Sequence, residues 1–205
     1  MSHDRFAMAD LTGGETNAII KMVGGAEGAR AILRGEKTLK VESVASKKIL
    51  AGLLEEVGEP IRFSSVKRFV ARDKLKVDVN GELPIWNLGE NLMANFGDLI
   101  EENVPAMTVK QRKLLNSSSD ENILVALGDK DFPKVKRARV YFAHVFEFLK
   151  TAYHSKWFIF YIADAKGTVW AVHAYWGADD SGWYVEADSV TLPDRWDADD
   201  QVVSR

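Results

Sequence analysis

Three stretches near the end of the chain decide the fold: Trp157-Phe-Ile-Phe-Tyr-Ile162, Thr168-Val-Trp-Ala-Val-His-Ala-Tyr-Trp176 and Trp183-Tyr-Val-Glu-Ala-Asp188. Each is rich in the β-branched and aromatic residues that favour strands. Two segments with the composition of turns separate them, Asp164–Gly167 and Gly177–Gly182. The pattern predicts a three-stranded antiparallel meander, which together with an acidic tail occupies residues 156–205.

The turn between the second and third strands predicts their register. The expected cross-strand pairs are Trp176 with Trp183, Tyr175 with Tyr184 and His173 with Glu186. A carboxylate opposite His173 would favour the imidazolium ion, so we expect a modestly raised pKa for this histidine.

Alternation along the strands assigns side chains to two faces. One face is expected to pack on a long helix, and it carries Trp157, Ile159, Tyr161, Trp170, Val172, Ala174, Trp176, Trp183, Val185 and Ala187. The other is aromatic at one end and polar at the other, and it carries Phe158, Phe160, Ile162, Ala171, His173, Tyr175, Tyr184, Glu186 and Asp188. The second face has the mixture of aromatic and polar groups that suits a contact between proteins.

The long helix is expected from Pro133 to about Ala152, because apolar residues recur there every three or four positions. Its core-facing residues would be Ala138, Phe142, Val145 and Leu149. Other helices are predicted over 44–57 and 90–103, over 120–127 after Ser119 as N-cap, and as a helical hairpin over 16–35. Asn80-Gly81 predicts a β-hairpin with strands over 75–79 and 82–86.

These elements predict an α+β fold: a helical N-terminal two-thirds with a β-hairpin, and a long central helix packed on a C-terminal three-stranded antiparallel meander. Residues 1–15 are expected to form a flexible arm and residues 16–205 a single domain.

The composition excludes several kinds of site. The 205 residues include no cysteine, which removes disulfides and Cys-ligated metals. The four histidines form no pair with helical ligand spacing, so we expect no metal and no cofactor. No apolar run approaches the roughly 18–20 residues that cross a bilayer. We therefore expect a cytoplasmic protein that does not bind membranes.

Charge is distributed unevenly along the chain. Residues 62–76 contain six basic residues and one acidic residue, and residues 130–156 contain seven and two. Residues 164–205 contain nine acidic residues and three basic ones. Basic residues interleaved with aromatic ones are typical of proteins that bind single-stranded nucleic acid. One hypothesis is therefore a nucleic-acid-binding accessory protein that uses segments 62–76 and 130–156, with Lys136, Arg137 and Arg139 among its contacts.

The sequence contains no Gly-x-Ser-x-Gly motif and no other recognisable catalytic set. The hypothesis that we favour is a non-enzymatic protein-interaction module that binds another protein or itself. The residues expected at its contact surface are Phe158, Phe160, His173, Tyr175 and Tyr184. A weaker alternative is a small hydrolase that uses His173.

Short motifs also connect the chain to other proteins. The clearest are Phe160-Tyr161, Trp176-Gly177, Gly182-Trp-Tyr-Val185 and Val203-Ser204-Arg205. In these motifs the chain resembles a family of uncharacterised proteins that recur in the genomes of small, uncultivated candidate-phylum bacteria. The resemblance implies a shared fold, and it implies no activity, cofactor or site because the family has none assigned.

Overall fold

A computed structural model describes residues 27, 30–31, 34, 52–129, 135–192 and 195–205. The chain divides into two units, Met1–Val44 and Ala45–Arg205. In the first unit Glu27, Arg30 and Ala31 are helical. The rest of the helical hairpin expected over 16–35, and the arm expected over 1–15, lie outside the described residues. The fold below is that of the second unit.

The three predicted strands of the meander are present as β6 (Phe158–Ala163), β7 (Val169–Gly177) and β8 (Gly182–Ser189). The predicted register of β7 and β8 is confirmed, because Trp176 lies opposite Trp183 and His173 lies opposite Glu186.

The predicted faces of β6 are wrong. Phe158 lies opposite Ala174 and Phe160 opposite Val172, so both phenylalanines share a face with Trp183. The reason is the turn after β6. The Asp164 carboxylate accepts the backbone N–H groups of Lys166 and Thr168, and the Asp164 N–H donates to the Thr168 carbonyl at 2.8 Å. This closed loop pairs Ala163 with Val169, which reverses the expected alternation of β6.

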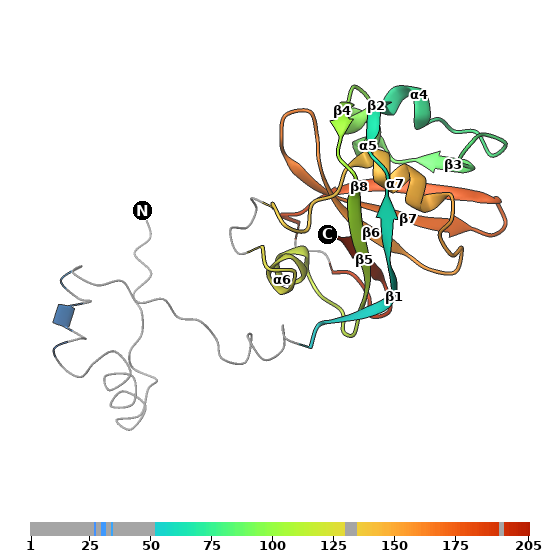
Figure 1. The fold of residues 1–205 in the computed structure, drawn as a ribbon. Helices are drawn as coiled ribbons and strands as arrows, with labels where there is room; N and C mark the ends of the chain where they lie inside the picture. The colour runs from blue at the N-terminus through green and yellow to red at the C-terminus, as the bar shows by residue number, and fades with distance from the viewer. Residues whose placement is uncertain (1–26, 28–29, 32–33, 35–51, 130–134, 193–194) are drawn as a thin grey trace. The chain divides into compact units, whose positions relative to one another are not determined.

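The meander forms the centre of a larger mixed sheet with the strand order β1-β5-β9-β6-β7-β8-β3 (Figure 1). The added strands are β1 (Leu54–Phe63), β5 (Met107–Leu114), β9 (Gln201–Ser204) and β3 (Ile85–Leu88). The β6–β9 and β3–β8 pairs are parallel, and the others are antiparallel. Strands β2 (Val66–Val70) and β4 (Ile100–Val104) form a separate antiparallel pair.

The protein is therefore mostly β, which corrects the expected α+β class with its helical N-terminal two-thirds. The predicted 44–57 helix is described only from residue 52 onward, and there it is wrong, because residues 54–57 belong to β1. Strand β1 pairs with β5 so that Glu55 faces Lys113 and Glu56 faces Arg112. Opposite charges on facing residues stabilise a strand pair. The apolar spacing that predicted the helix could not reveal this pairing, because the partner residues lie in β5.

Two further expected elements differ. The predicted 90–103 helix ends early as α5 (Glu90–Phe96), and β4 follows it. The predicted hairpin around Asn80-Gly81 consists of one isolated bridge between Asp78 and Ile85. Its return strand is β3, which apart from that bridge pairs with β8.

The long helix expected over 133–152 is also wrong, because in the described residues only α7 (Phe142–Leu149) forms there. The Asp129 carboxylate accepts the backbone N–H groups of Lys136, Arg137 and Ala138, which an extended helix would use internally.

The Val140 N–H donates to the Tyr161 carbonyl of β6 at 3.0 Å. The chain thereby crosses from one side of the sheet to the other. The residues predicted to form one apolar helix face therefore lie in two different core clusters. Ala138 packs with one core cluster, whereas Phe142, Val145 and Leu149 pack with the other.

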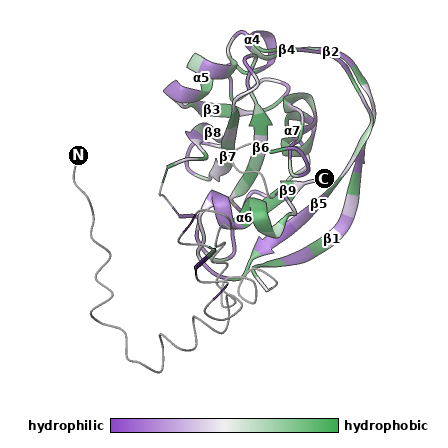
Figure 2. Cartoon of the chain, turned by 90° about the vertical axis from the view of Figure 1, so that its left-hand side faces the viewer, coloured by the Kyte–Doolittle hydropathy of each residue, from purple (hydrophilic) through white to green (hydrophobic). Residues whose placement is uncertain are grey.

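Both faces of the sheet are covered. Helix α7 packs on the face with Phe158 and Phe160, and α6 (Asp120–Ala126), the helix predicted after Ser119, packs on the face with Ile159 and Tyr161. The short helix α4 (Ala71–Lys74) follows β2. Figure 2 colours β6 as hydrophobic and β1 as mixed, as expected for a central and an edge strand. No helix in the described residues has the length and apolar character needed to cross a bilayer.

Candidate functional site

Four aromatic side chains lie in sequence across one end of the central strands. Trp157 precedes β6, Tyr175 belongs to β7, Tyr184 to β8 and Trp86 to β3, and these strands are neighbours in the sheet. The rings of Trp157 and Tyr175 stack with their centroids 4.0 Å apart, and those of Tyr175 and Tyr184 stack at 4.8 Å. We call these four residues the aromatic row.

Trp86 joins the row through a local irregularity of β3. Ile85 pairs with Trp183 and Asn87 with Tyr184, so Trp86 is an extra residue in the strand. The Trp86 indole is near enough to the Tyr184 hydroxyl to lower the pKa of Tyr184 slightly, against the larger effects that raise it. The two ends of the row are the most open, since Trp86 is 45 % and Trp157 is 43 % exposed.

Acidic side chains flank the row. The Tyr184 hydroxyl donates to Asp180 Oδ2 at 2.5 Å, and this hydrogen bond raises the pKa of Tyr184 to about 12. The pKa of Tyr175 is raised mainly by burial and further by the charges of Glu186 and Asp180. Both phenols therefore stay neutral at physiological pH, and the net charge beside them is negative.

His173 lies beneath this surface, with 6 % of its area exposed. Its Nε2 is 3.1 Å from Asp188 Oδ2 and 4.0 Å from Glu186 Oε2. Its ring contacts those of Trp157 and Trp196, with centroids 5.9 Å and 5.1 Å away. Burial lowers the pKa of His173 more than the two carboxylates raise it, which corrects the predicted upward shift.

This geometry gives no support to the hydrolase hypothesis. A general base must reach the proton that it removes, and His173 is covered by two tryptophans. A cavity of about 200 Å³ lies next to Asp188 and includes Asp120 and Trp196 in its lining. Asp120 Oδ1 already accepts hydrogen bonds from the Tyr161 hydroxyl and the Trp196 indole, both at 2.8 Å. Among the described residues no three His, Asp or Glu side chains are grouped as a metal site would need.

The structure brings together only part of the expected contact surface. Tyr175 and Tyr184 belong to the aromatic row and His173 supports it. Phe158 and Phe160 are fully buried and lie edge-on to Phe148 of α7, so they are core residues. They were predicted to lie on the surface because the prediction assigned the residues of β6 to the wrong faces of the sheet.

Sequence reasoning missed the two ends of the row. The correct alternation of β6 would have identified Trp157, because Asp164 and its turn carry the necessary signal. Trp86 had no such local signal. Its position depends on the parallel pairing of β3 with β8, which joins segments almost 100 residues apart in the sequence.

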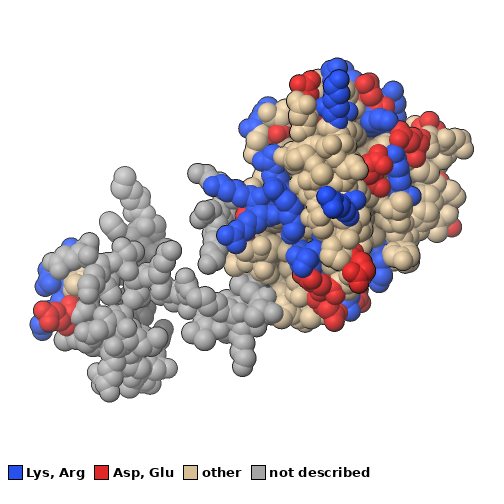
Figure 3. Space-filling model, in the orientation of Figure 1, with Lys and Arg blue, Asp and Glu red and all other residues tan. Residues whose placement is uncertain are grey.

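The basic residues Lys136, Arg137 and Arg139 lie on the segment that leads to α7 and are separate from the aromatic row. Arg205 is next to them, because its guanidinium donates to the carbonyl oxygens of Arg139 and Lys136. Figure 3 shows Lys and Arg side chains gathered on the face where this segment emerges.

In the other basic segment, 62–76, three of the six basic residues have an acidic partner. Arg72 binds Asp98 at 2.5 Å, and Arg68 approaches Glu102 at 3.9 Å. Lys74 binds Glu82 at 2.5 Å. Among the described basic residues of segment 130–156, only Lys150 has an acidic partner.

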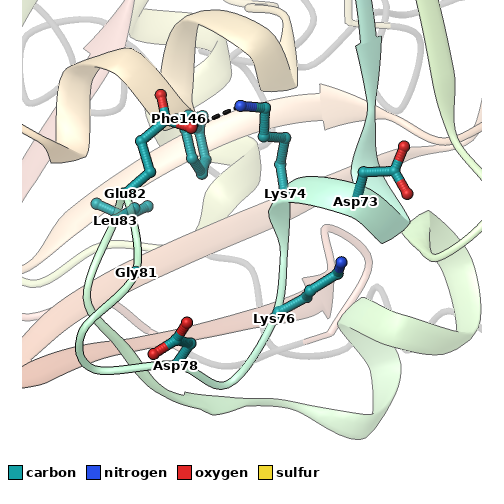
Figure 4. Close-up of a pocket in the computed structure, with 8 residues that line it drawn as sticks. All are labelled: Asp73, Lys74, Lys76, Asp78, Gly81, Glu82, Leu83 and Phe146. Atoms are coloured by element: carbon teal, nitrogen blue, oxygen red, sulfur yellow. Dashed lines mark hydrogen bonds and ion pairs between the residues drawn. The ribbon is translucent and has the colours of Figure 1, made fainter.

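A cavity of about 280 Å³ contains the Lys74–Glu82 pair (Figure 4). Glu82 also accepts a hydrogen bond from Lys150, and the hydrogen bonds from Lys150 and Lys74 lower the pKa of Glu82 to about 2. Both lysines lie over the Phe146 ring, 5.5 Å and 4.9 Å from its centroid. These charges satisfy one another, so we assign them a role in attaching α7 rather than in binding.

Comparison with known proteins returns no match: no family model, no curated protein and no solved structure is similar to this chain.

Proposed function

We propose that this protein is a non-enzymatic protein-interaction module and that the aromatic row is its contact surface. The partner that fits this surface is a peptide segment rich in Lys or Arg. The observation that carries the proposal is the stack of Trp157, Tyr175 and Tyr184, partly exposed and flanked by carboxylates.

Partly exposed aromatic rings on a rigid sheet are well suited to binding. Tyr and Trp provide large contact areas and lose little conformational entropy, which is why they dominate the energetics of many interfaces. The strand backbones and the ring stacking hold these side chains in place before a partner arrives. Such preorganisation reduces the entropic cost of association.

Charge supports a cationic partner. The faces of Trp and Tyr rings attract cations, and guanidinium groups in particular stack on them. Asp180, Glu186 and Asp188 lie close enough to the row to pair with the same groups. A phosphate backbone would meet repulsion from these carboxylates, which disfavours nucleic acid on this face.

The nucleic-acid hypothesis receives less support. It requires basic residues that are free to contact phosphates, and Arg68 and Arg72 lie beside Glu102 and Asp98 instead. Binding through Lys136, Arg137 and Arg139 would fall steeply as salt increases.

The test is a titration of a fluorescein-labelled peptide of alternating Arg and Gly, followed by fluorescence anisotropy at 150 mM salt. The matched peptide with Glu in place of Arg is the specificity control. We expect saturable binding of the Arg peptide, no binding of the Glu peptide, and at least about a tenfold loss of affinity for Trp157→Ala, because the variant removes the largest exposed ring of the stack.

Tyr153→Ala is the matched variant, since Tyr153 is an aromatic residue with 76 % of its area exposed outside the row. It should bind as the wild type does. Equal binding of both peptides, or equal binding by Trp157→Ala and the wild type at equal unfolding midpoints, would remove the proposal.

A further inference from the structure

A cavity of about 440 Å³ lies away from the aromatic row, where three parts of the chain meet. These parts are the segment before α7, the turn between β6 and β7, and the end of β8. The polar residues in its lining are Lys136, Arg139, Thr168, Ser189 and Thr191. The volume lies within the range of roughly 300–1,000 Å³ that is usual for small-molecule sites.

The composition of this lining distinguishes the cavity from the other two that we describe. The cavity with Lys74 also contains Asp73, Asp78 and Glu82, and the cavity beside Asp188 contains Asp120. The 440 Å³ cavity contains two cationic side chains and three hydroxyl groups in its lining, and none of its lining residues is acidic. Its electrostatic character therefore favours an anion.

The two cations are available to a ligand. Among the described residues no acidic side chain lies within ion-pair distance of Lys136 or Arg139. The carboxylate influenced by Arg139 is that of Glu101, and its oxygens already accept the backbone N–H groups of Phe142 and Ala143 at 2.9 Å and 2.8 Å. An anion entering the cavity would thus add a partner to these cations without displacing an ion pair.

The backbone that bears the cations is fixed in several places. The Lys136 N–H donates to Asp129 Oδ1 at 2.8 Å. Arg205 donates to the carbonyl oxygen of Lys136 at 3.1 Å and to that of Arg139 at 2.9 Å. These bonds explain why the segment holds its place without helical structure, and they fix the backbone positions from which the two cationic side chains extend.

Hydroxyl groups and an apolar wall complete the cavity. The side-chain oxygens of Ser189 and Thr191 are 2.9 Å apart, so one hydroxyl donates to the other and the second proton is free for a ligand. Valine residues contribute apolar surface, as a site for an organic molecule requires: Val135, Val169 and Val190.

We propose that this cavity binds a small organic molecule that carries a phosphate group. Arg139 and Lys136 would pair with the phosphate oxygens, and the hydroxyls of Thr168 and Thr191 would donate to them. The valine side chains would contact the organic part. Arg offers a planar fork of donors that matches phosphate geometry, and Lys adds a mobile point charge.

The test is isothermal titration calorimetry of the full chain with glycerol 3-phosphate, and with glycerol as the uncharged control, at 150 mM salt. We expect measurable binding of the phosphate compound and none of glycerol. The double variant Lys136→Gln/Arg139→Gln should lose at least about tenfold in affinity, as expected when two charge-assisted contacts are removed. Thr191→Val should weaken binding by a smaller factor because it removes one donor.

Lys166→Gln is the matched control, since it removes one nearby positive charge from a residue that does not line the cavity. It should retain wild-type affinity, and Trp157→Ala should retain it as well, which separates this site from the aromatic row. Undetectable glycerol 3-phosphate binding, or equal losses for Lys166→Gln and the double variant, would overturn the proposal.

Two further arms distinguish the sources of a phosphate group. Vesicles of phosphatidylcholine with 20 % phosphatidic acid test a lipid headgroup, and a single-stranded oligonucleotide tests a polyanion. Binding to the vesicles in addition to glycerol 3-phosphate, with the same loss in the double variant, would assign the phosphate to a headgroup. Binding to the oligonucleotide without binding to glycerol 3-phosphate would overturn the proposal, because it would show that the basic residues act as an open surface for polyanions and not as a small-molecule site.

Discussion

The two faces of the main sheet use the same strands for different purposes. On the α7 side, aromatic and aliphatic side chains form one buried cluster, in which Phe158, Phe160 and Trp183 have no exposed area. On the α6 side, the buried groups include Asp120, and the surface ends in the aromatic row. Since neighbouring residues of a strand point to opposite faces, one face can stabilise the fold while the other presents polar and aromatic groups to a partner.

The difference between the faces predicts how mutations will act. A packed apolar face loses stability when a side chain is truncated, because a cavity remains. A polar face loses stability when a buried donor is left without its acceptor. The exposed groups at the rim should matter least. Four measurements follow, in the order of the effect that we expect.

The largest effect is expected for Phe142→Ala on the α7 side. Phe142 is 1 % exposed, and its ring lies 5.4 Å from that of Phe96 and 6.1 Å from that of Phe69. Truncating such a side chain should lower the free energy of unfolding by about 3–5 kcal/mol. Urea denaturation measures this, and Trp157→Ala is the comparison, with a smaller expected loss because Trp157 is already 43 % exposed. Equal losses of unfolding free energy in the two variants would show that the two faces do not differ in the way described.

The second effect is expected for Asp120→Ala on the α6 side. The variant leaves the hydroxyl of the fully buried Tyr161 and the indole N–H of Trp196 without their acceptor. We expect a loss of about 2–3 kcal/mol in the free energy of unfolding, because an unsatisfied buried donor carries its full desolvation cost.

Tyr161→Phe provides the control for Asp120→Ala, since it removes one donor and leaves the acceptor paired with Trp196. It should lose about 1 kcal/mol. Burial raises the pKa of Tyr161, and Asp120 raises it further. An absorbance titration in which Tyr161 ionises at the ordinary pKa of a tyrosine would contradict its position in this core.

The sequence alone predicted the part of this fold that depends on local signals. Alternation within β7 and β8 and the glycine-bounded turn between them predicted a register that places Tyr175 against Tyr184. The N-cap position of Ser119 and the acidic first turn of α6 likewise predicted a helix that is present. These features involve residues close together in the chain, so the pattern contains the information needed.

The rest depends on partners that are distant in sequence. The segment before α7 has the spacing of a helix, but Asp129 and Tyr161 provide hydrogen bonds that the pattern could not reveal. Trp86 joins the aromatic row only because β3 pairs in parallel with β8. The expected pKa of His173 was wrong for a similar reason: its neighbouring carboxylates were predicted, but the burial that outweighs them was not.

The third effect concerns pH and the buried His173. Burial lowers its pKa in the folded protein below the ordinary value of 6.5, so the unfolded chain binds a proton more readily. As the pH falls through 6.5 the unfolded state is therefore favoured, and His173 makes the protein less stable in acid. An NMR titration should give a pKa below 6.5 for His173, and Asp188→Asn should lower it further because the nearest carboxylate charge is lost.

Stability measured at pH 7.5 and 5.5 should drop less in His173→Gln than in the wild type. This difference isolates His173, because the pKa of the buried His144 is also lowered and contributes equally to both proteins. A His173 pKa above 6.5, or one that Asp188→Asn leaves unchanged, would show that the two side chains do not interact as described.

The smallest effect is expected at the rim of the α7 side, for Glu82→Gln. Lys150 and Lys74 hold the pKa of Glu82 near 2, so the carboxylate stabilises the fold at neutral pH and would lose that effect as the pH falls from 4.5 towards 2. Glu82 is about half exposed, and solvent screens its ion pairs. We therefore expect the variant to lose less than about 1 kcal/mol at pH 7, and the loss to shrink in 1 M salt. Glu59→Gln, on an exposed residue of β1 without an ion pair in the described structure, is the charge-matched control and should change stability by less. A loss for Glu82→Gln as large as that for Asp120→Ala would mean that this rim contributes as much as the buried polar core of the α6 side.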